Sequence, residues 1–376
     1  MRTCDLTGGS RYPRRVTIPT RPVRQEQEPA REDVTEVAPG MLRLQLPISL
    51  PGLGHVNCYA LEDAHGLALV DPGLPGPQSW RALQARLTAA GFPVRRVHTV
   101  VVTHSHPDHF GGANRLRRES GAAIVTSALF RNWWDAGSDA ELDSADDPGT
   151  PVSVDDAPGS SSARSGAGGT TPWGGRRHRP PARRRVQMRV MRSFASNMFT
   201  VPDPTQRLDD AETIRLAGRE WIAVHTPGHT PDHLCLLDPA EGVLLSGDHV
   251  LPTITPHISG VGAGADPLQR FFSSLERMHA LAGVRTVLPA HGHPFEDLHA
   301  RADAIRDHHL ERLTTLRRAM DALGPATVAD LSHELFKPRS WGSMAESETY
   351  AHLEHLRLAG ESTRDEAEGV LRYRTA

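Results

Sequence analysis

The segment THSHPDHFGG concentrates side chains that bind metal ions, and its first histidine directly follows the apolar stretch Thr99–Thr103. Backbone that leaves a strand into a short loop can turn alternate side chains toward one point. Imidazole nitrogen and carboxylate oxygen are the ligands that zinc prefers in hydrolytic sites. One metal ion can take the first two histidines, and the two residues that follow can serve a second ion. The four candidates are His104, His106, Asp108 and His109.

Three later motifs each add one candidate ligand. They are HTPGHTPDH, LLSGDH and VLPAHG, which supply His229, Asp248 and His291. Each candidate lies just past the C-terminal end of an apolar segment, and open α/β sheets collect ligands at that edge. A single histidine beside glycine is usually only a loop residue. Together with the first motif, however, these residues complete two coordination shells, which predicts a dinuclear metal site.

The elements that position these residues follow an alternating order in the first half of the chain. Leu67–Asp71 and Thr99–Thr103 are patterns of buried strands, and Gln78–Ala90 between them is typical of an amphipathic helix. Strand–helix–strand order predicts an α/β layered fold. In the second half we expect strands at 220–226, 235–237, 243–246 and 286–290, and helices at 266–281 and 298–323.

The ordered motifs resemble those of the metallo-β-lactamase superfamily. The resemblance rests on HSHPDH, on the three later ligands and on the upstream VDPG (Val70–Gly73), and it covers about residues 37–300. It implies an αββα sandwich with the metal ions at one edge. It also implies the following roles: His104, His106 and His229 hold one zinc ion, Asp108, His109 and His291 hold the other, Asp248 bridges them, and Asp71 hydrogen-bonds the ligand loop to orient a histidine.

The resulting prediction is a hydrolase with two zinc ions, although iron or manganese would also suit the ligands. Zinc lowers the pKa of bound water to about 7, so a hydroxide bridging two ions can attack at neutral pH. We expect a small ester, thioester or lactone as substrate, with Asp108 as a catalytic residue that accepts a proton. Relatives that reduce oxygen place Glu where this chain has His106, which favours hydrolysis.

Composition divides the chain into three expected parts. Residues 1–35 are rich in Pro, Arg and Glu and are predicted to be a disordered tail. Residues 36–300 are predicted to form the metal-binding domain, interrupted by a low-complexity insertion at 135–205 that we place at the active-site mouth as a lid or substrate wall. Residues 301–376 have the helix–helix–hairpin outline of a small winged-helix-like domain, as in the lactamase-β-like subgroup.

Two alternative functions stay open at this point. An endoribonuclease that cuts single-stranded RNA could use the arginine-rich segment Arg176–Arg192. A non-catalytic nucleic-acid-binding regulator would need a vestigial metal site, which the intact ligands argue against. The expected recognition helix, Ala345–Gly360, carries three glutamates against Arg357 alone, which disfavours contact with DNA phosphates and favours a packing or dimer role.

Charge, cysteine content and the lack of long apolar runs indicate the expected location and partners of the protein. A net charge of −3 excludes a globally basic nucleic-acid binder, and three widely spaced cysteines do not suggest a disulfide framework. We find neither a signal-peptide pattern nor an apolar run long enough for a membrane span, so we expect a cytoplasmic location and a small-molecule partner, with the oligomeric state open. The histidines next to the motifs are expected to have ordinary roles; they are His225, His233, His249, His257 and His293.

Overall fold

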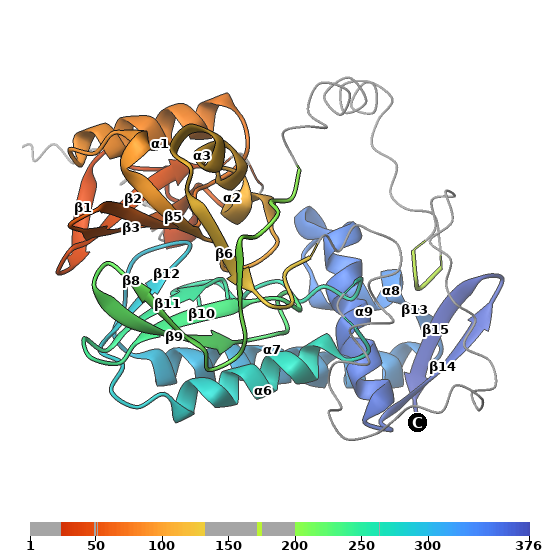
Figure 1. Cartoon of the computed structure of the whole chain (residues 1–376). Helices are drawn as coiled ribbons and strands as arrows, with labels where there is room; N and C mark the ends of the chain where they lie inside the picture. Colours follow the sequence, from red (N-terminus) through yellow and green to blue (C-terminus); the bar gives the residue numbers. More distant parts are fainter. Residues whose placement is uncertain (1–23, 49, 51, 132–170, 175–199, 263) are drawn as a thin grey trace, which may run out of the picture.

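The computed structural model describes residues 24–48, 50, 52–131, 171–174, 200–262 and 264–376 of the chain. Two β-sheets lie face to face, with helices on the outer side of each (Figure 1). The layers therefore follow the order helix, sheet, sheet, helix that the sequence predicts. The C-terminal residues form a further unit of helices and a small sheet beside these layers.

The first sheet has seven strands in chain order. Its first four strands are antiparallel neighbours, and β4, β5, β6 and β7 are parallel to one another. The strands are β1 (Val34–Ala38), β2 (Met41–Pro47), β3 (His55–Asp63), β4 (Gly66–Val70), β5 (Val97–Val101), β6 (Ala123–Ser127) and β7 (Gln206–Leu208).

Among the described residues, three helices belong to this first half. α1 (Pro77–Ala89) connects the parallel strands β4 and β5, and it buries Trp80, Leu83 and Leu87, as the helical pattern predicts. α2 (Pro107–Phe110) and α3 (Ala113–Ser120) follow β5. Two short 3-10 turns, Gln25–Gln27 and Val94–Arg96, complete this half of the described chain.

The second sheet has the strand order β12–β11–β10–β9–β8. β11 and β12 are parallel, and the other neighbours are antiparallel. Its outer side is covered by α6 (Pro267–Ala280) and the long α7 (Leu298–Leu323), which Asp266 and Asp297 cap at their N-termini (Figure 1). The strands are β8 (Thr213–Leu216), β9 (Arg219–His225), β10 (Leu234–Asp238), β11 (Val243–Gly247) and β12 (Thr286–Pro289).

Three hydrophobic clusters hold the layers together. One lies between the two sheets and contains Tyr59, Val101 and the fully buried Trp221. A second packs the first sheet against α1 and α3, and a third joins the second sheet to α6, α7 and the C-terminal unit. Burial of large apolar side chains such as these contributes about 1.5–3 kcal/mol each. The loops that carry the candidate ligands therefore begin at strand ends that are held in a well-packed core.

The C-terminal unit consists of two helices and a three-stranded sheet. α9 packs against α6, α7 and α8, and its buried residues lie on several sides of the helix. A helix buried in this way is not available to enter a nucleic-acid groove. The elements are β13 (Ala326–Thr327), α8 (Val328–Leu335), a 3-10 turn (Pro338–Ser340), α9 (Ser343–Leu358), β14 (Ser362–Ala367) and β15 (Val370–Thr375).

The structure differs from the expected disordered tail over residues 24–35. Glu26 is buried and accepts hydrogen bonds from the backbone of Thr253 and Ile254, and Glu28 lies 2.9 Å from the ring of His293. These partners are distant in sequence, so the composition of the segment could not reveal them. Residues 1–23 lie outside the described part of the chain.

Most of the expected insertion at 135–205, including Arg176–Arg192, also lies outside the described residues. Within it, residues 171–174 and 200–205 are described, and buried Trp173 donates from its indole nitrogen to Glu346 of α9, 3.1 Å away. The helices that the structure describes include none long and apolar enough to span a bilayer.

Candidate metal centre

The residues predicted to bind metal come together in two adjacent groups. In the first, Nε2 of His104 lies 2.8 Å from Nδ1 of His106, and Nε2 of His229 lies 3.1 Å from the same Nδ1 atom. A carboxylate oxygen of Asp248 is 3.6 Å from Nε2 of His229. All four ligand atoms lie within 4.8 Å of one another. The spacing is compact enough for one ion to contact all four.

The second group contains Asp108, His109 and His291, again with ligand atoms within 4.8 Å of one another. Oδ2 of Asp108 is 3.6 Å from Nε2 of His109 and 3.5 Å from Nε2 of His291. Asp248 also faces this group, at 3.6 Å from His109 and 3.3 Å from His291. Asp248 therefore lies between the two groups. This is the position that the family resemblance implies for a ligand shared by two ions.

Strand ends explain why residues so distant in sequence meet. His104, His229, Asp248 and His291 follow β5, β9, β11 and β12, whose C-terminal ends share one edge of the two sheets. Asp108 and His109 lie on α2, which begins at the residue after His106. Proline at the first position of α2 fixes the turn that separates the two pairs of ligands.

Four of the histidines are oriented by a hydrogen bond from the ring nitrogen that faces away from the centre. Nδ1 of His229 donates to the backbone oxygen of His257 at 2.7 Å, and Nδ1 of His291 donates to that of His55 at 2.7 Å. Nδ1 of His104 lies 3.0 Å from the hydroxyl of Thr103. Such contacts leave Nε2 as the ligand atom and fix the ring direction.

Asp71 orients the fourth histidine, His109, whose Nδ1 lies 2.9 Å from Oδ2 of Asp71. The same carboxylate accepts from the backbone nitrogen of Thr103 at 2.9 Å and from its hydroxyl at 2.8 Å. The backbone of Asp71 has φ of +56°, a left-handed conformation that is costly for a residue with a side chain. In this conformation the carboxylate of Asp71 reaches both Thr103 and His109.

The donor set fits a pair of divalent metal ions. Nε2 of His109, Nε2 of His291 and Oδ1 of Asp248 are buried and make no hydrogen bond within the described residues. Buried polar atoms are nearly always satisfied by a partner. Nε2 of His291 lies 3.3 Å from Oδ1 of Asp248, and Nε2 of His109 lies 3.6 Å from Oδ2 of the same carboxylate. A cation at this place would supply the partner that each atom lacks. Nitrogen and carboxylate ligands suit zinc, manganese and iron.

The electrostatics of the two groups differ. Burial, together with the nearby charges of other histidines, holds the pKa of His104 and His106 well below the usual value, which favours the neutral form that a metal ligand needs. Burial acts in the same direction on His109, but the charges of Asp108 and the other carboxylates outweigh it and raise its pKa well above the usual value. Burial opposes the charged form of Asp248, yet the facing histidines keep its pKa well below normal.

Two of the histidines that we expected to have ordinary roles support the ligand loops. Nε2 of His233 accepts a hydrogen bond from the backbone nitrogen of Asp248 at 3.0 Å, and His257 supplies the carbonyl that orients His229. The sequence carries no signal for a backbone carbonyl as a partner. Asp232 lies behind the same loops, 3.0 Å from the hydroxyl of Ser105, and burial raises the pKa of Asp232 to about 6.

The other three lie away from the ligand atoms. His225 contacts the backbone oxygen of Pro231, and His293 pairs with Glu28. His249 is buried against Phe271, with ring centroids 5.1 Å apart. Cys58 and Cys235 are free and buried, as expected for core residues.

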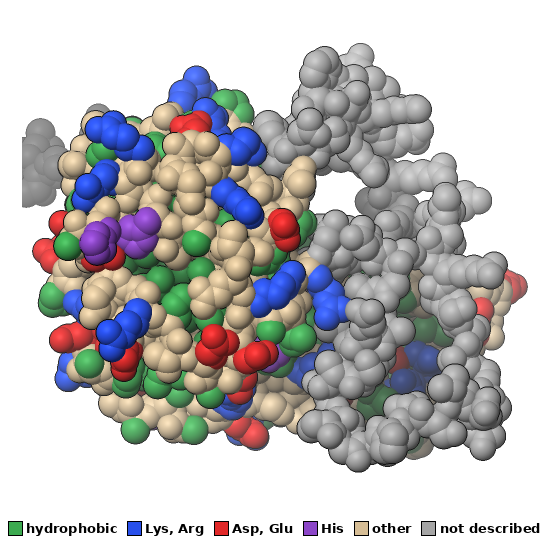
Figure 2. Space-filling view, in the orientation of Figure 1, with side chains coloured by type: hydrophobic (Ala, Val, Ile, Leu, Met, Phe, Trp, Pro, Cys, Tyr) green, Lys and Arg blue, Asp and Glu red, His purple; other side chains and the backbone are tan. Residues whose placement is uncertain are grey.

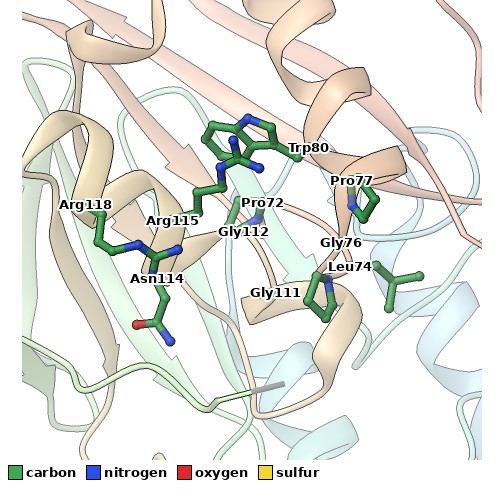
Figure 3. Close-up of a pocket in the computed structure, with 11 residues that line it drawn as sticks. Pro72, Leu74, Gly76, Pro77, Trp80, Gly111, Gly112, Asn114, Arg115 and Arg118 are labelled. Atoms are coloured by element: carbon green, nitrogen blue, oxygen red, sulfur yellow. The ribbon is translucent and has the colours of Figure 1, made fainter. Parts of the chain in front are cut away.

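A separate pocket of about 250 Å³ lies among the loop after β4, α1 and α3 (Figure 3). It is lined by the loop after Asp71 and by α3, where the guanidinium of Arg115 stands 4.3 Å above the ring of Trp80. None of the seven candidate ligands lines it. The face in Figure 2 shows side chains of both charge signs, in keeping with the small net charge.

The comparison with known proteins agrees with the fold. The model of the metallo-beta-lactamase superfamily matches residues 51–313, well over half of the chain. Among solved structures, a metallo-beta-lactamase family protein from Thermus thermophilus is 29% identical with a TM-score of 0.69, covering 91% of this chain and 100% of that one. A beta-lactamase domain protein from Burkholderia ambifaria is 28% identical with a TM-score of 0.70, covering 93% and 95%.

This chain therefore belongs to the metallo-beta-lactamase superfamily, whose members are generally hydrolytic enzymes. An atrochrysone carboxyl ACP thioesterase from Aspergillus fumigatus is 31% identical over 147 residues, which cover 36% of this chain and 44% of that protein. The protein YobT from Bacillus subtilis is 27% identical over 198 residues, which cover 53% and 63%. The chain thus matches less than two thirds of the length of these relatives.

Proposed function

We propose that the protein is a metal-dependent hydrolase with two zinc ions that cleaves a small thioester. Esters and lactones, which react through the same acyl carbon, are the nearest alternatives. The observation that supports this most strongly is the convergence of seven residues into two groups with ligand atoms within 4.8 Å. Single-ion structural sites do not need a second group of ligands or a carboxylate between the groups.

The residues divide between the ions as follows. His104, His106 and His229 would hold the first ion, Asp108, His109 and His291 the second, and Asp248 both. Such a pair of ions supplies an ionised water molecule as the nucleophile and polarises the carbonyl oxygen of the substrate. Manganese or iron would fit the same ligands, so the metal in the cell is a separate question.

The side chains of this protein have defined roles around that chemistry. Asp108 belongs to the second group, with Oδ2 near His109 and His291, and we assign it to accept the proton that the attacking water releases as well as to bind metal. Asp71, His55 and His257 hold the imidazole rings in the tautomers that metal binding requires. The loops close around a largely buried set of ligands, and exclusion of water strengthens each of these contacts.

The choice of a thioester rests on the relatives and on the reaction. The Aspergillus fumigatus relative is named as a thioesterase, although the match covers less than half of it. A thiolate is a good leaving group and needs little protonation, so a site that supplies a nucleophile and an oxyanion partner is sufficient. The RNA alternative could use Arg176–Arg192, which lies outside the described residues, so the substrate panel below includes RNA.

The test is a substrate panel with the purified protein reconstituted with zinc. Release of thiol from acyl thioesters is followed with a thiol reagent, beside matched oxygen esters, lactones, phosphodiesters and a short single-stranded RNA. The proposal predicts a kcat/KM for at least one thioester that exceeds the value for its matched oxygen ester and that falls to background after metal is removed. Cleavage of RNA alone, or thioester cleavage that a chelator leaves unchanged, would contradict it.

A further inference from the structure

A buried polar network in the C-terminal part of the chain reaches the metal centre through one carbonyl group. The backbone oxygen of His257 accepts the hydrogen bond from Nδ1 of His229, at 2.7 Å. The side chain of the same residue lies 3.1 Å from Oε2 of Glu348, which is on α9 and only 7% exposed. Arg312 of α7 pairs with the other oxygen of that carboxylate. Three contacts therefore link α7 and α9 to a candidate metal ligand.

The network continues behind Glu348. Its backbone oxygen accepts a hydrogen bond from Nδ1 of His352 at 2.7 Å, and Nε2 of that ring lies 3.0 Å from Nδ1 of His309. Both histidines are fully buried. Burial lowers the pKa of His352 to about 4 and lowers that of His309 as well, so both rings are neutral near pH 7. The carboxylate is therefore the one anion of this network, and Arg312 balances it.

The loop that carries His257 has a fixed place on α9. The hydroxyl of Ser347 accepts a hydrogen bond from the backbone nitrogen of Gly260 at 3.1 Å. A Cβ atom at Gly260 would stand 2.6 Å from the backbone oxygen of Ser347, so the loop lies directly on the helix. The loop that follows His257 is therefore held against α9 at Gly260.

We propose that Glu348 is a positioning residue for the metal centre: it holds His257 so that the carbonyl of that residue keeps His229 aimed at the first group of ligands. The inference rests on the metal site of the proposed function. It assigns a function to the C-terminal unit. His229 lies on the loop that follows β9, and α9 supports that side chain through Glu348 and His257.

A different occupant of the same network would be a third metal ion. His309, Glu348 and His352 also offer ligand atoms within 4.8 Å of one another. Both oxygens of the carboxylate are already engaged, however, by Arg312 and by His257. A divalent ion would add charge beside a guanidinium in a buried region, which is costly. We therefore favour the supporting role, and the number of bound ions distinguishes the two.

Glu354 provides a matched control on the same helix. It is also 7% exposed, and its carboxylate pairs with Arg357, Arg364 and the hydroxyl of Tyr373, all in the C-terminal unit. Glu354→Gln and Glu348→Gln each leave arginine partners without their anion. Only Glu348 has a path to His229, so a difference between the two variants reports on that path.

The experiment measures zinc stoichiometry and affinity of the full chain by competition with a chromophoric chelator. Two ions per chain are expected for the unsubstituted protein. Glu348→Gln should weaken binding of one of them about tenfold, the effect usual for loss of a group that supports a ligand. Glu354→Gln should bind both ions as the unsubstituted protein does. The spectrum of the cobalt-substituted protein should change only for Glu348→Gln.

His257→Ala keeps the carbonyl and removes only the tether, and it carries the test if Glu348→Gln does not fold. It should weaken the same ion, and the double variant should be no weaker than either single one, because both changes break one link. Additive effects, or equal affinity in Glu348→Gln and the unsubstituted protein, overturn the inference.

Two further outcomes separate the possible failures. In the first, the unsubstituted protein binds three ions per chain and His352→Ala binds two, with the other sites unchanged. This result would mean that the network is a third metal site and would overturn the supporting role. Absence of tight zinc in the unsubstituted protein overturns the proposed function and, with it, this inference. Two tight ions in every variant overturn this inference alone and leave the proposed function standing.

Discussion

Asp71 and His109 form a buried pair, with Oδ2 of the carboxylate 2.9 Å from Nδ1 of the ring. The backbone of Asp71 is held at φ of +56°, and its side chain also binds the backbone and hydroxyl of Thr103. One carboxylate thus fixes both the loop that leaves β5 and the ring that points into the second group of ligands. The strain at this residue is the cost of that double contact.

Asp71→Asn tests this relationship with little change of shape, because asparagine tolerates a positive φ. The loss of charge weakens the hold on Nδ1 of His109, so we expect the affinity for one zinc ion to fall about 10- to 100-fold. A chelator competition assay measures this. The ion held by His104, His106 and His229 should be affected less. An unchanged affinity for both ions would show that the pair has no part in metal binding.

His106→Ala and Asp248→Ala remove ligands from the candidate centre directly. We expect the metal content of each purified variant to fall and hydrolysis to fall to background, since Asp248 faces both groups and His106 contacts two other ligands. Elemental analysis and the thioester assay check this. His279→Ala is the control, because His279 pairs with Asp303 on the surface. Normal zinc content and rate in His106→Ala would refute the assignment.

Metal uptake should depend on pH in a definite direction. Burial opposes protonation of His291, but the charge of Asp248 and then that of Asp108 outweigh it, so the pKa of His291 is raised, as is that of His109. In the metal-free protein both rings therefore retain a proton at a pH where a free histidine would have lost it. Zinc must displace these protons.

The expected result is tighter binding at pH 8 than at pH 6, with proton release on binding. Calorimetry in two buffers that differ in ionisation enthalpy counts the protons. Uptake that releases none between pH 6 and pH 8 would mean that these rings are already neutral or are not ligands. Replacing His291 by Ala should reduce the number released.

Gly247 precedes Asp248 and has φ of +50°. A Cβ atom there would lie 2.6 Å from Nε2 of His233, the atom that accepts the hydrogen bond from the backbone of Asp248. Gly247→Ala should therefore lower both the stability and the metal affinity, with a strain cost of about 1–3 kcal/mol before the clash is counted.

Gly283→Ala is the matched control, because Gly283 has φ of +77° and nothing within 4 Å of the added atom. Thermal unfolding should show a lower stability in both variants. Zinc competition should show a lower metal affinity in Gly247→Ala alone. Equal metal affinity in the two variants would mean that the contact of His233 with the backbone of Asp248 does not position the ligand.

The sequence could predict the parts of the fold that repeat a local pattern. Strands such as β4 and β5, helix α1 with its buried Trp80, and the full length of α7 follow directly from apolar periodicity and from stop signals such as Gly324. The meeting of the seven candidate ligands followed from their places after apolar strands. Their roles as ligands stay a prediction until a metal ion is located.

The sequence could not predict contacts made through backbone atoms or between distant segments. The carbonyls of His55 and His257 orient two of the ring ligands, and no side-chain pattern marks a carbonyl. Glu26 lies in a segment with the composition of a disordered tail, yet its carboxylate binds backbone more than two hundred residues away. Glu348 belongs to a helix whose acids favoured a packing or dimer role over contact with DNA, but no pattern in the sequence marks Arg312 as its buried partner.

Anomalous diffraction from crystals of the zinc-loaded protein, recorded on both sides of the zinc absorption edge, tests the central claim most directly. The account predicts two peaks per chain: one among His104, His106, His229 and Asp248, and one among Asp108, His109, His291 and Asp248. Peaks located only elsewhere in the chain, or none where these side chains converge, would contradict it.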